Sequence, residues 1–201
     1  MRLGIFGGTF DPVHLGHLIL AEQCREQGGL ERVLFIPAAR PPHKHTQPLT
    51  SFAQRVEMLQ LAVAGQPAFH IEELEKDRPG PSYTVDTLEE LRRRHADAEF
   101  WLVLGADTLQ DLPQWYEPAR IARLAGFLVA CRPGARIAAA AELEDTLGLP
   151  AGTMRLQIVD MPLLEISGRD VRRRIGAGRS IRYMVPRAVE AYIADKGLYR
   201  Q

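Results

Sequence analysis

Cysteine is scarce in this sequence, and neither sign of charge is in excess. The two cysteines, Cys24 and Cys131, show no CxxC spacing and no neighbouring histidines, so neither a disulfide framework nor a zinc site is expected. Lysine and arginine together number 25, as do aspartate and glutamate, and the net charge of zero argues against a general nucleic-acid binder. Local basic clusters can still bind small anions.

Long apolar runs are also missing. No run approaches the roughly 18 residues that a membrane-spanning helix needs, and the N-terminus begins with a strand-like segment instead of a basic and then apolar leader. We therefore expect a cytoplasmic protein with no membrane or nucleic-acid partner. With 201 residues, 46% of them hydrophobic, the chain is expected to form one domain over residues 1–201.

Short apolar segments rich in Ile, Val, Leu and Phe alternate with helical patterns. Continuous apolar runs of this length are typical of strands buried on both faces of a parallel sheet. The predicted strands lie at residues 2–6, 32–36, 68–71, 100–104, 127–131 and 156–159. The alternation predicts an α/β fold, with a doubly wound, mainly parallel sheet and helices on both faces.

Helix signals separate these strands. Ser51 is placed to cap a helix that stops at Gly65, and apolar residues repeat every three positions between residues 85 and 91. A last helix is expected between Pro186 and Gly197.

Three loops follow the first three predicted strands. They are the glycine-rich segment after residue 6, the proline-rich segment 37–48 and the segment 75–84. In an open α/β sheet the loops at the carboxyl ends of the strands line the ligand crevice, so these loops should converge.

The first of these loops contains two adjacent glycines. Gly7 and Gly8 carry no Cβ, so a ligand can approach the backbone closely here. The segment matches neither the dinucleotide fingerprint G-x-G-x-x-G nor the P-loop pattern, which disfavours a nicotinamide-dependent oxidoreductase. Taken alone, the glycines fit a tight strand-to-helix turn.

His14 and His17 follow the glycines and share one face at the start of a helix that begins near residue 13 or 14. Either ring alone could be structural, and a metal pair would need a third ligand that is not evident. A helix start offers free N–H groups, and an imidazolium ring would add donors. Beside the glycines and Thr9, contact with a phosphate is the favoured interpretation, and no metal ligand is assigned.

The segment "GGTFDPVHLGH", residues 7–17, resembles the signature of nucleotidyltransferases that carry an H-x-G-H motif. Further matching segments follow in order: "PPHK" at 41–44, "SYTVDTL" at 82–88, "GADTL" from 105 with Trp115 after it, and "ISGRDVR" at 166–172. Together they resemble the bacterial nicotinate-mononucleotide adenylyltransferases, from residue 2 to the final helix. In that family the last segment usually reads I-S-S-T-x-x-R, so Gly168 and Arg169 replace two hydroxyl side chains here.

The resemblance implies a Rossmann-like nucleotidyltransferase fold and a reaction in NAD biosynthesis. ATP and nicotinate mononucleotide would give deamido-NAD and pyrophosphate, with Mg²⁺ bound together with ATP. The attacking phosphate oxygen is already anionic, so alignment of the phosphates and neutralisation of their charge are needed instead of a general base. The oligomeric state stays open, a homodimer included.

The resemblance also implies roles for individual residues. His17 would donate to the α-phosphate, and the other implied catalytic residues are His14, Lys44 and Arg172. The residues implied to bind the mononucleotide are Gly8, Lys44, Thr84 and Trp115. Those implied to bind ATP are Gly7, Gly8, Thr9, Phe10, His14, His17, Gly105, Asp107, Ser167, Gly168, Arg169 and Arg172.

Alternatives remain for the residues and for the function. Trp115 could belong to the core or a lid, Thr84 could cap its helix, and Lys44 could be a solvated charge. The protein could instead adenylylate nicotinamide mononucleotide or phosphopantetheine, or it could be a nucleotide-binding regulator without catalysis. Pyrophosphate release with each candidate substrate separates these functions.

Overall fold

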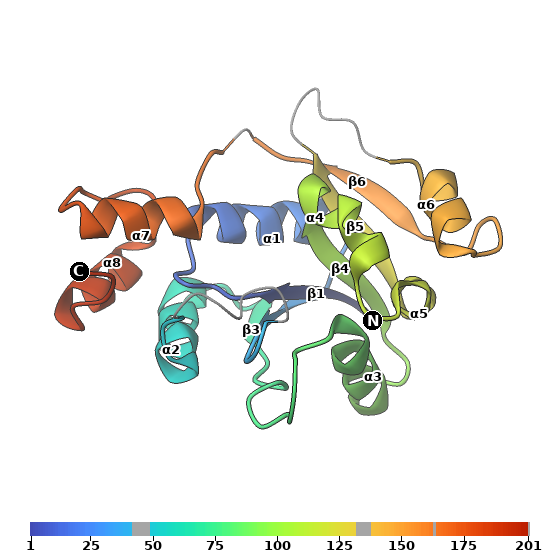
Figure 1. Cartoon of the computed structure of the whole chain (residues 1–201), viewed down its shortest axis with the longest axis horizontal. Helices are drawn as coiled ribbons and strands as arrows, with labels where there is room; N and C mark the ends of the chain where they lie inside the picture. Colours follow the sequence, from blue (N-terminus) through green and yellow to red (C-terminus); the bar gives the residue numbers. More distant parts are fainter. Residues whose placement is uncertain (42–48, 132–137, 163, 201) are drawn as a thin grey trace.

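A computed structural model describes residues 1–41, 49–131, 138–162 and 164–200. Its centre is a six-stranded sheet with the order β3-β2-β1-β4-β5-β6, in which each neighbouring pair is parallel (Figure 1). The strands are β1 (Arg2–Gly8), β2 (Arg32–Pro37), β3 (Phe69–Ile71), β4 (Glu99–Gly105), β5 (Ala125–Cys131) and β6 (Leu156–Asp160). The predicted doubly wound sheet is confirmed, and each predicted strand lies within two residues of the observed bounds.

Two apolar cores cover the two faces of the sheet. Successive strand residues point to opposite faces, so Leu34 and Ile36 of β2 belong to one core while Val33 and Phe35 belong to the other. The first core is covered by α3 (Thr84–Arg94), α4 (Ala106–Gln110), a 3-10 turn (Leu112–Gln114), α5 (Pro118–Leu124) and α6 (Ala140–Leu147). The second is covered by α1 (Leu15–Gln27), α2 (Phe52–Val63), α7 (Gly168–Gly176) and α8 (Arg187–Asp195).

The predicted helix signals lie where the helices begin and end. The backbone N–H of Gln54 donates to Oγ of Ser51 at 3.3 Å, which caps α2, and Pro186 directly precedes α8. The sequence patterns did not predict α4, α5 and α6, because helices of five, seven and eight residues show too little periodicity. In the described ranges, no helix is long and apolar enough to cross a membrane.

The order of the strands places a crevice between β1 and β4. These strands are neighbours, with Arg2 paired to Glu99, but the chain leaves them in opposite directions along the sheet. After β1 it crosses through α1 to β2, and after β4 it crosses to β5. In open α/β sheets ligands bind at such a reversal, outside the carboxyl ends of the strands.

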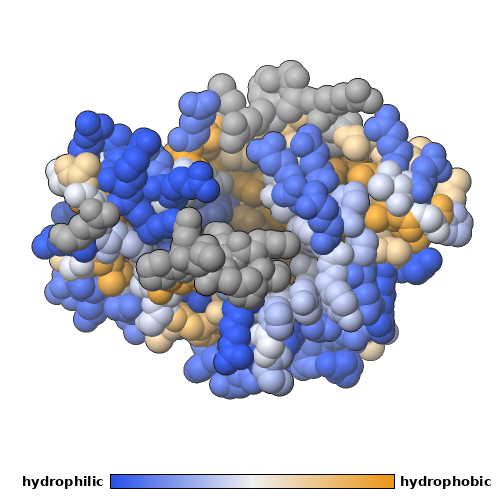
Figure 2. All heavy atoms as spheres, viewed as in Figure 1, coloured by the Kyte–Doolittle hydropathy of each residue, from blue (hydrophilic) through white to orange (hydrophobic). Residues whose placement is uncertain are grey.

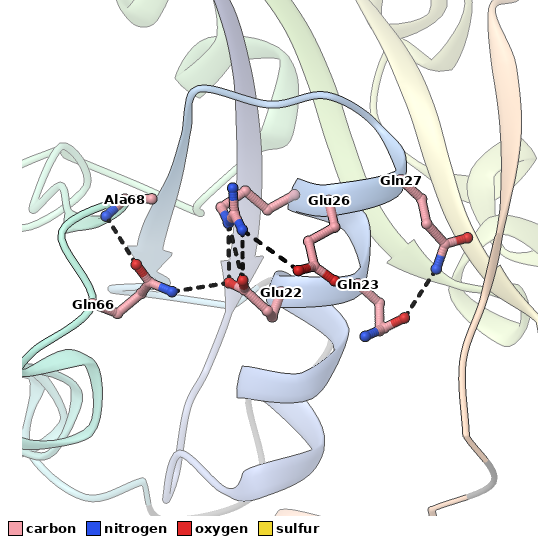
Figure 3. Close-up of polar contacts among 7 residues, drawn as sticks. Glu22, Gln23, Glu26, Gln27, Gln66 and Ala68 are labelled. Atoms are coloured by element: carbon pink, nitrogen blue, oxygen red, sulfur yellow. Dashed lines mark hydrogen bonds and ion pairs between the residues drawn. The ribbon is translucent and has the colours of Figure 1, made fainter.

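Helix α1, which follows the glycine turn, is held by polar contacts at its far end. Glu22 accepts a hydrogen bond from Nε2 of Gln66, and Oε1 of Gln66 accepts one from the N–H of Ala68 before β3 (Figure 3). At the other edge of the sheet, the amide side chain of Gln27 bonds both the N–H and the carbonyl of Asp160 in β6, at 2.9 and 2.8 Å. These contacts fix α1 across the sheet and thereby fix the start of the helix at the crevice.

Candidate active site

A cavity of about 850 Å³ opens at the carboxyl ends of β1, β2 and β4. Loops 7–9, 38–41 and 82–84, which follow the first three strands, all contribute to its wall, so the predicted convergence of these loops is confirmed for the described residues. The short helical segment after β4 also contributes to the wall. Among the residues that line the cavity are Gly7, Gly8, Thr9, Glu75, Ser82, Tyr83, Thr84, Thr108, Asp111, Trp115 and Tyr116.

Both glycines of the turn line this cavity, and a side chain is unfavourable at each position for a different reason. A Cβ on Gly7 would meet no atom within 4 Å, so a side chain there would occupy the space that a ligand needs. A Cβ on Gly8 would lie 2.9 Å from the ring of Phe10, closer than packed atoms approach. Phe10 itself is 1% exposed with a φ of 49°, so its ring belongs to the core beneath the turn and only its backbone is available to a nucleotide.

The two histidines form one stacked unit. His14 is the N-terminal cap of α1, which begins at Leu15, one residue after the later of the two predicted starts. The ring of His14 lies 3.6 Å from that of His17 between centroids. The main-chain N–H of His14 donates to Nδ1 of His17 at 3.2 Å. Since Nδ1 accepts, a neutral His17 carries its proton on Nε2, which makes Nε2 a hydrogen-bond donor.

Burial decides the charge of His14. The ring is 6% exposed, and desolvation lowers its pKa from 6.5 to about 4. His14 is therefore neutral near pH 7, and the expected imidazolium is not present at this position in the free protein. Its Nδ1 is buried without a hydrogen-bond partner among the described residues, so a polar group remains to be satisfied beside the turn.

The start of α7 lies against the same turn. Oγ of Ser167 accepts a hydrogen bond from the N–H of Asp170 at 3.2 Å, so Ser167 caps α7 and Gly168 is the first helical residue. Nη1 of Arg172 donates to the carbonyl of Asp11 at 2.6 Å. A Cβ on Gly168 would lie 3.1 Å from that same carbonyl oxygen, so glycine permits the close approach of helix and turn.

The remaining ATP-binding candidates lie at the end of β4, in α4 and at the start of α7. Figure 2 shows the surface hollowed between the regions of α7 and α4, with hydrophobic atoms at the bottom and hydrophilic side chains on both sides. Gly105 ends β4 and Asp107 is exposed in the first turn of α4, while Arg169 is exposed at the start of α7. Lys44 lies outside the described residues.

Thr84 and Trp115 both line this cavity. Thr84 is the first residue of α3, and Tyr83 occupies the cap position, so Thr84 does not cap the helix. Trp115 is partly buried against the core. Beside them the rings of Tyr83 and Tyr116 are 4.5 Å apart between centroids.

Sequence reasoning missed both tyrosines and the buried carboxylate of Glu75. Each tyrosine is adjacent to a predicted residue, Tyr83 to Thr84 and Tyr116 to Trp115, and this adjacency was the available signal. Glu75 is 6% exposed; it accepts a hydrogen bond from Thr87 at 2.8 Å and one from the N–H of Ala39 at 3.4 Å. It thereby connects the loop after β2 to α3.

Residues 5–174 match the cytidylyltransferase-like family, and the chain belongs to this family. A "Probable nicotinate-nucleotide adenylyltransferase" from Thermomicrobium roseum is 52% identical over 200 residues, covering 99% of this chain and 92% of the relative. One of the same name from Thermus thermophilus is 47% identical over 202 residues and covers the full length of both chains. The resemblance inferred from the motifs is thereby confirmed.

Solved structures agree with the fold. The nicotinic acid mononucleotide adenylyltransferase of Plasmodium falciparum, in complex with NaAD, superposes with a TM-score of 0.79 and covers 98% of this chain and 97% of its own. The two sequences are 19% identical, so this likeness concerns the fold.

Proposed function

We propose that this protein transfers the adenylyl group of ATP to nicotinate mononucleotide, producing deamido-NAD and pyrophosphate. One observation carries the proposal: a glycine turn, a donor histidine and a helix start meet at the same end of the sheet as a cavity lined by Thr84 and Trp115. The first group of features suits phosphates, and the second suits a planar ring that bears a carboxylate.

The phosphate half of the site performs the chemistry in this proposal. The phosphate oxygen of the mononucleotide is already anionic and attacks the α-phosphorus, so the protein has to align two charged groups and stabilise the charge that develops. His17 donates from Nε2 to the α-phosphate. Gly7 and Gly8 admit the phosphates to the backbone, and Thr9 and His14 lie beside them.

The triphosphate and the ribose of ATP extend toward α7 and α4. The N–H groups of Gly168 and Arg169 lie in the first turn of α7, where intrahelical partners are missing, and with Ser167 and Arg172 they would hold the β- and γ-phosphates. Gly105 and Asp107 would contact the ribose of ATP from the end of β4. Phe10 would contribute its backbone only.

The other half of the site selects the acceptor. Trp115 would stack on the pyridine ring, Thr84 would donate to the carboxylate, and Gly8 with Lys44 would receive the mononucleotide phosphate. A donor that pairs with a carboxylate is left mismatched by the N–H₂ group of an amide, so the donors of this wall decide between nicotinate and nicotinamide.

We propose that Mg²⁺ enters with ATP. Mg²⁺ is usually bound through substrate phosphates together with one or two protein carboxylates. Within the described residues, no three His, Cys, Asp or Glu side chains are grouped so as to hold a metal ion. When bound it neutralises phosphate charge. We also propose that residues 1–201 form one nucleotidyltransferase domain, since both cores share one sheet, and that the protein is cytoplasmic.

Pyrophosphate release with ATP and each candidate acceptor tests the function. We expect kcat/KM for nicotinate mononucleotide to exceed that for nicotinamide mononucleotide by roughly 100-fold, because the amide leaves buried donors unpaired. Equal values would contradict the nicotinate assignment alone. A purified chain that binds ATP but releases no pyrophosphate with any acceptor would instead be a nucleotide-binding regulator.

A further inference from the structure

Three segments far apart in the sequence meet at Asp11. This residue is 5% exposed and lies in the turn between the glycines and His14. Its Oδ1 accepts a hydrogen bond from the Tyr199 hydroxyl at 2.6 Å, and its Oδ2 accepts one from the N–H of Thr50 at 3.3 Å. Its main-chain carbonyl accepts the hydrogen bond from Arg172 of α7.

The same turn is also held from the core by an arginine. Arg55 of α2 is 1% exposed and donates to two carbonyl oxygens, that of Thr9 at 2.7 Å and that of Thr50 at 3.0 Å. Burial lowers its pKa, and the nearby Asp11 carboxylate acts in the opposite direction. The turn therefore rests on buried polar groups, whose loss would leave charges and carbonyls unsatisfied.

Tyr199 reaches Asp11 from an unfavourable backbone conformation. Its φ is 62°, in the left-handed region that residues with a Cβ avoid. Such a conformation persists where surrounding contacts require it. Burial and the bond to Asp11 raise the pKa of the Tyr199 hydroxyl, so it stays a donor throughout the physiological range. The ring packs against the core that α1, α2, α7 and α8 share.

We infer that Tyr199 is a positioning residue that acts through Asp11 to set the separation between the histidine-bearing turn and the start of α7. This inference rests on the proposed function, since the two elements would hold the α-phosphate and the β,γ-phosphates of ATP respectively. In this inference Tyr199 acts without contacting either substrate. Removal of its hydroxyl takes away one of the two hydrogen bonds described above for the Asp11 carboxylate, and the carbonyl of the same residue is the one that Arg172 binds. We expect the turn then to shift relative to the start of α7, and such a shift weakens the binding and alignment of ATP.

The chain offers a matched control. The hydroxyl of Tyr192 in α8 donates to Oε2 of Glu57 in α2 at 2.6 Å, the same distance as between Tyr199 and Asp11. Both tyrosines pack against the same core, but the hydroxyl of Tyr192 is bonded to a helix and that of Tyr199 to the turn. Tyr199→Phe and Tyr192→Phe each remove one hydroxyl that donates to a carboxylate and keep the ring.

The experiment compares both variants with the unmodified full chain. For Tyr199→Phe we expect KM for ATP to rise about tenfold with KM for nicotinate mononucleotide within twofold, while Tyr192→Phe leaves both unchanged. The rise in melting temperature on adding ATP should shrink for Tyr199→Phe only, a readout that does not need turnover. Asp11→Asn should raise KM for ATP similarly, and combining it with Tyr199→Phe should add little.

The outcomes separate the two proposals. If the unmodified chain releases no pyrophosphate but ATP still stabilises it, the proposed function fails, and the ATP-induced shift of the two variants still decides the role of Tyr199. Unchanged ATP parameters in Tyr199→Phe, whatever its loss of thermal stability, would reduce Tyr199 to a structural residue. A chain that ATP does not stabilise at all would overturn both.

Discussion

His14 fixes the tautomer of His17. The rings stack at 3.6 Å between centroids, with an interplanar angle of 21°, and the main-chain N–H of His14 donates a hydrogen bond to Nδ1 of His17. The proton of His17 is thereby assigned to Nε2 before any substrate arrives, and a donor that is already oriented loses little on reaching the transition state.

If this donor acts on the transition state, His17→Ala should lower kcat by at least about 100-fold, the effect of removing one such group. The ring also contacts Phe10, at 5.1 Å between centroids, so a modest fall in melting temperature is expected as well. Single-turnover kinetics measure the chemical step directly. His95→Ala, at the end of α3, serves as the control and should leave kcat unchanged. A near-normal kcat for His17→Ala would make the residue structural.

The buried His14 predicts a pH dependence of stability. Its pKa is about 4 in the folded protein and 6.5 in the unfolded chain, so between these values only the unfolded chain binds the proton. The free energy of unfolding therefore falls as pH drops through this window. Compared with His14→Asn, the unmodified chain should lose about 2 kcal/mol between about pH 7 and pH 5. Urea unfolding without ligand measures this loss. Parallel pH profiles for the two proteins would refute the neutral, buried state of His14.

Two glycines of α7 allow a paired test of the contact between helix and turn. A Cβ on Gly168 would press on the carbonyl of Asp11, which is held in place by Arg172, whereas a Cβ on Gly176 would meet only the carbonyl of Tyr199 at 3.6 Å. Gly176→Ala should therefore raise stability by about 0.5–1 kcal/mol through helix propensity. Gly168→Ala should lack that gain and raise KM for ATP several-fold, as measured by steady-state kinetics. The same change in stability and in KM for ATP in both variants would mean that the turn moves to accommodate the methyl group.

Trp115 should affect one substrate only. If it stacks on the pyridine ring, Trp115→Ala should raise KM for the mononucleotide by an amount equivalent to about 1–3 kcal/mol, with KM for ATP little changed, and Trp115→Phe should restore part of the loss. Mononucleotide binding should also change the tryptophan fluorescence. Trp101 gives a constant background, because its ring is 7% exposed and packs on Arg2. An unchanged mononucleotide KM would assign Trp115 to the core.

The strands and the cap of α7 could be predicted because their causes are local. Strands buried on both faces must be apolar throughout, as the core positions Val33 to Ile36 are, and a serine three residues before an acidic residue is a common start of a helix. The patterns also predicted which loops would meet, since the carboxyl ends of parallel strands share one edge.

The polar network around the turn could not be predicted in this way. Tyr199 and Asp11 are 188 positions apart, and a tyrosine near a helix end gives no indication of its partner. The buried Arg55 resembles any charged residue of an amphipathic helix until the fold places the carbonyl of Thr9 beside it. The neutral state of His14 could not be predicted either, because desolvation depends on what covers the ring and not on its neighbours in sequence.

The wide spacing of the site along the sequence has a consequence for refolding. Gly8 and Arg172 are far apart in the sequence, and the strand pair β1–β4, at whose carboxyl ends the crevice lies, joins residues 2 and 99. Pairings between distant segments form late, because loop closure must be completed first. After dilution from denaturant, the far-ultraviolet signal of the helices should return before pyrophosphate release does. Enzymatic activity is then the stricter measure of how much of a preparation has reached the native topology.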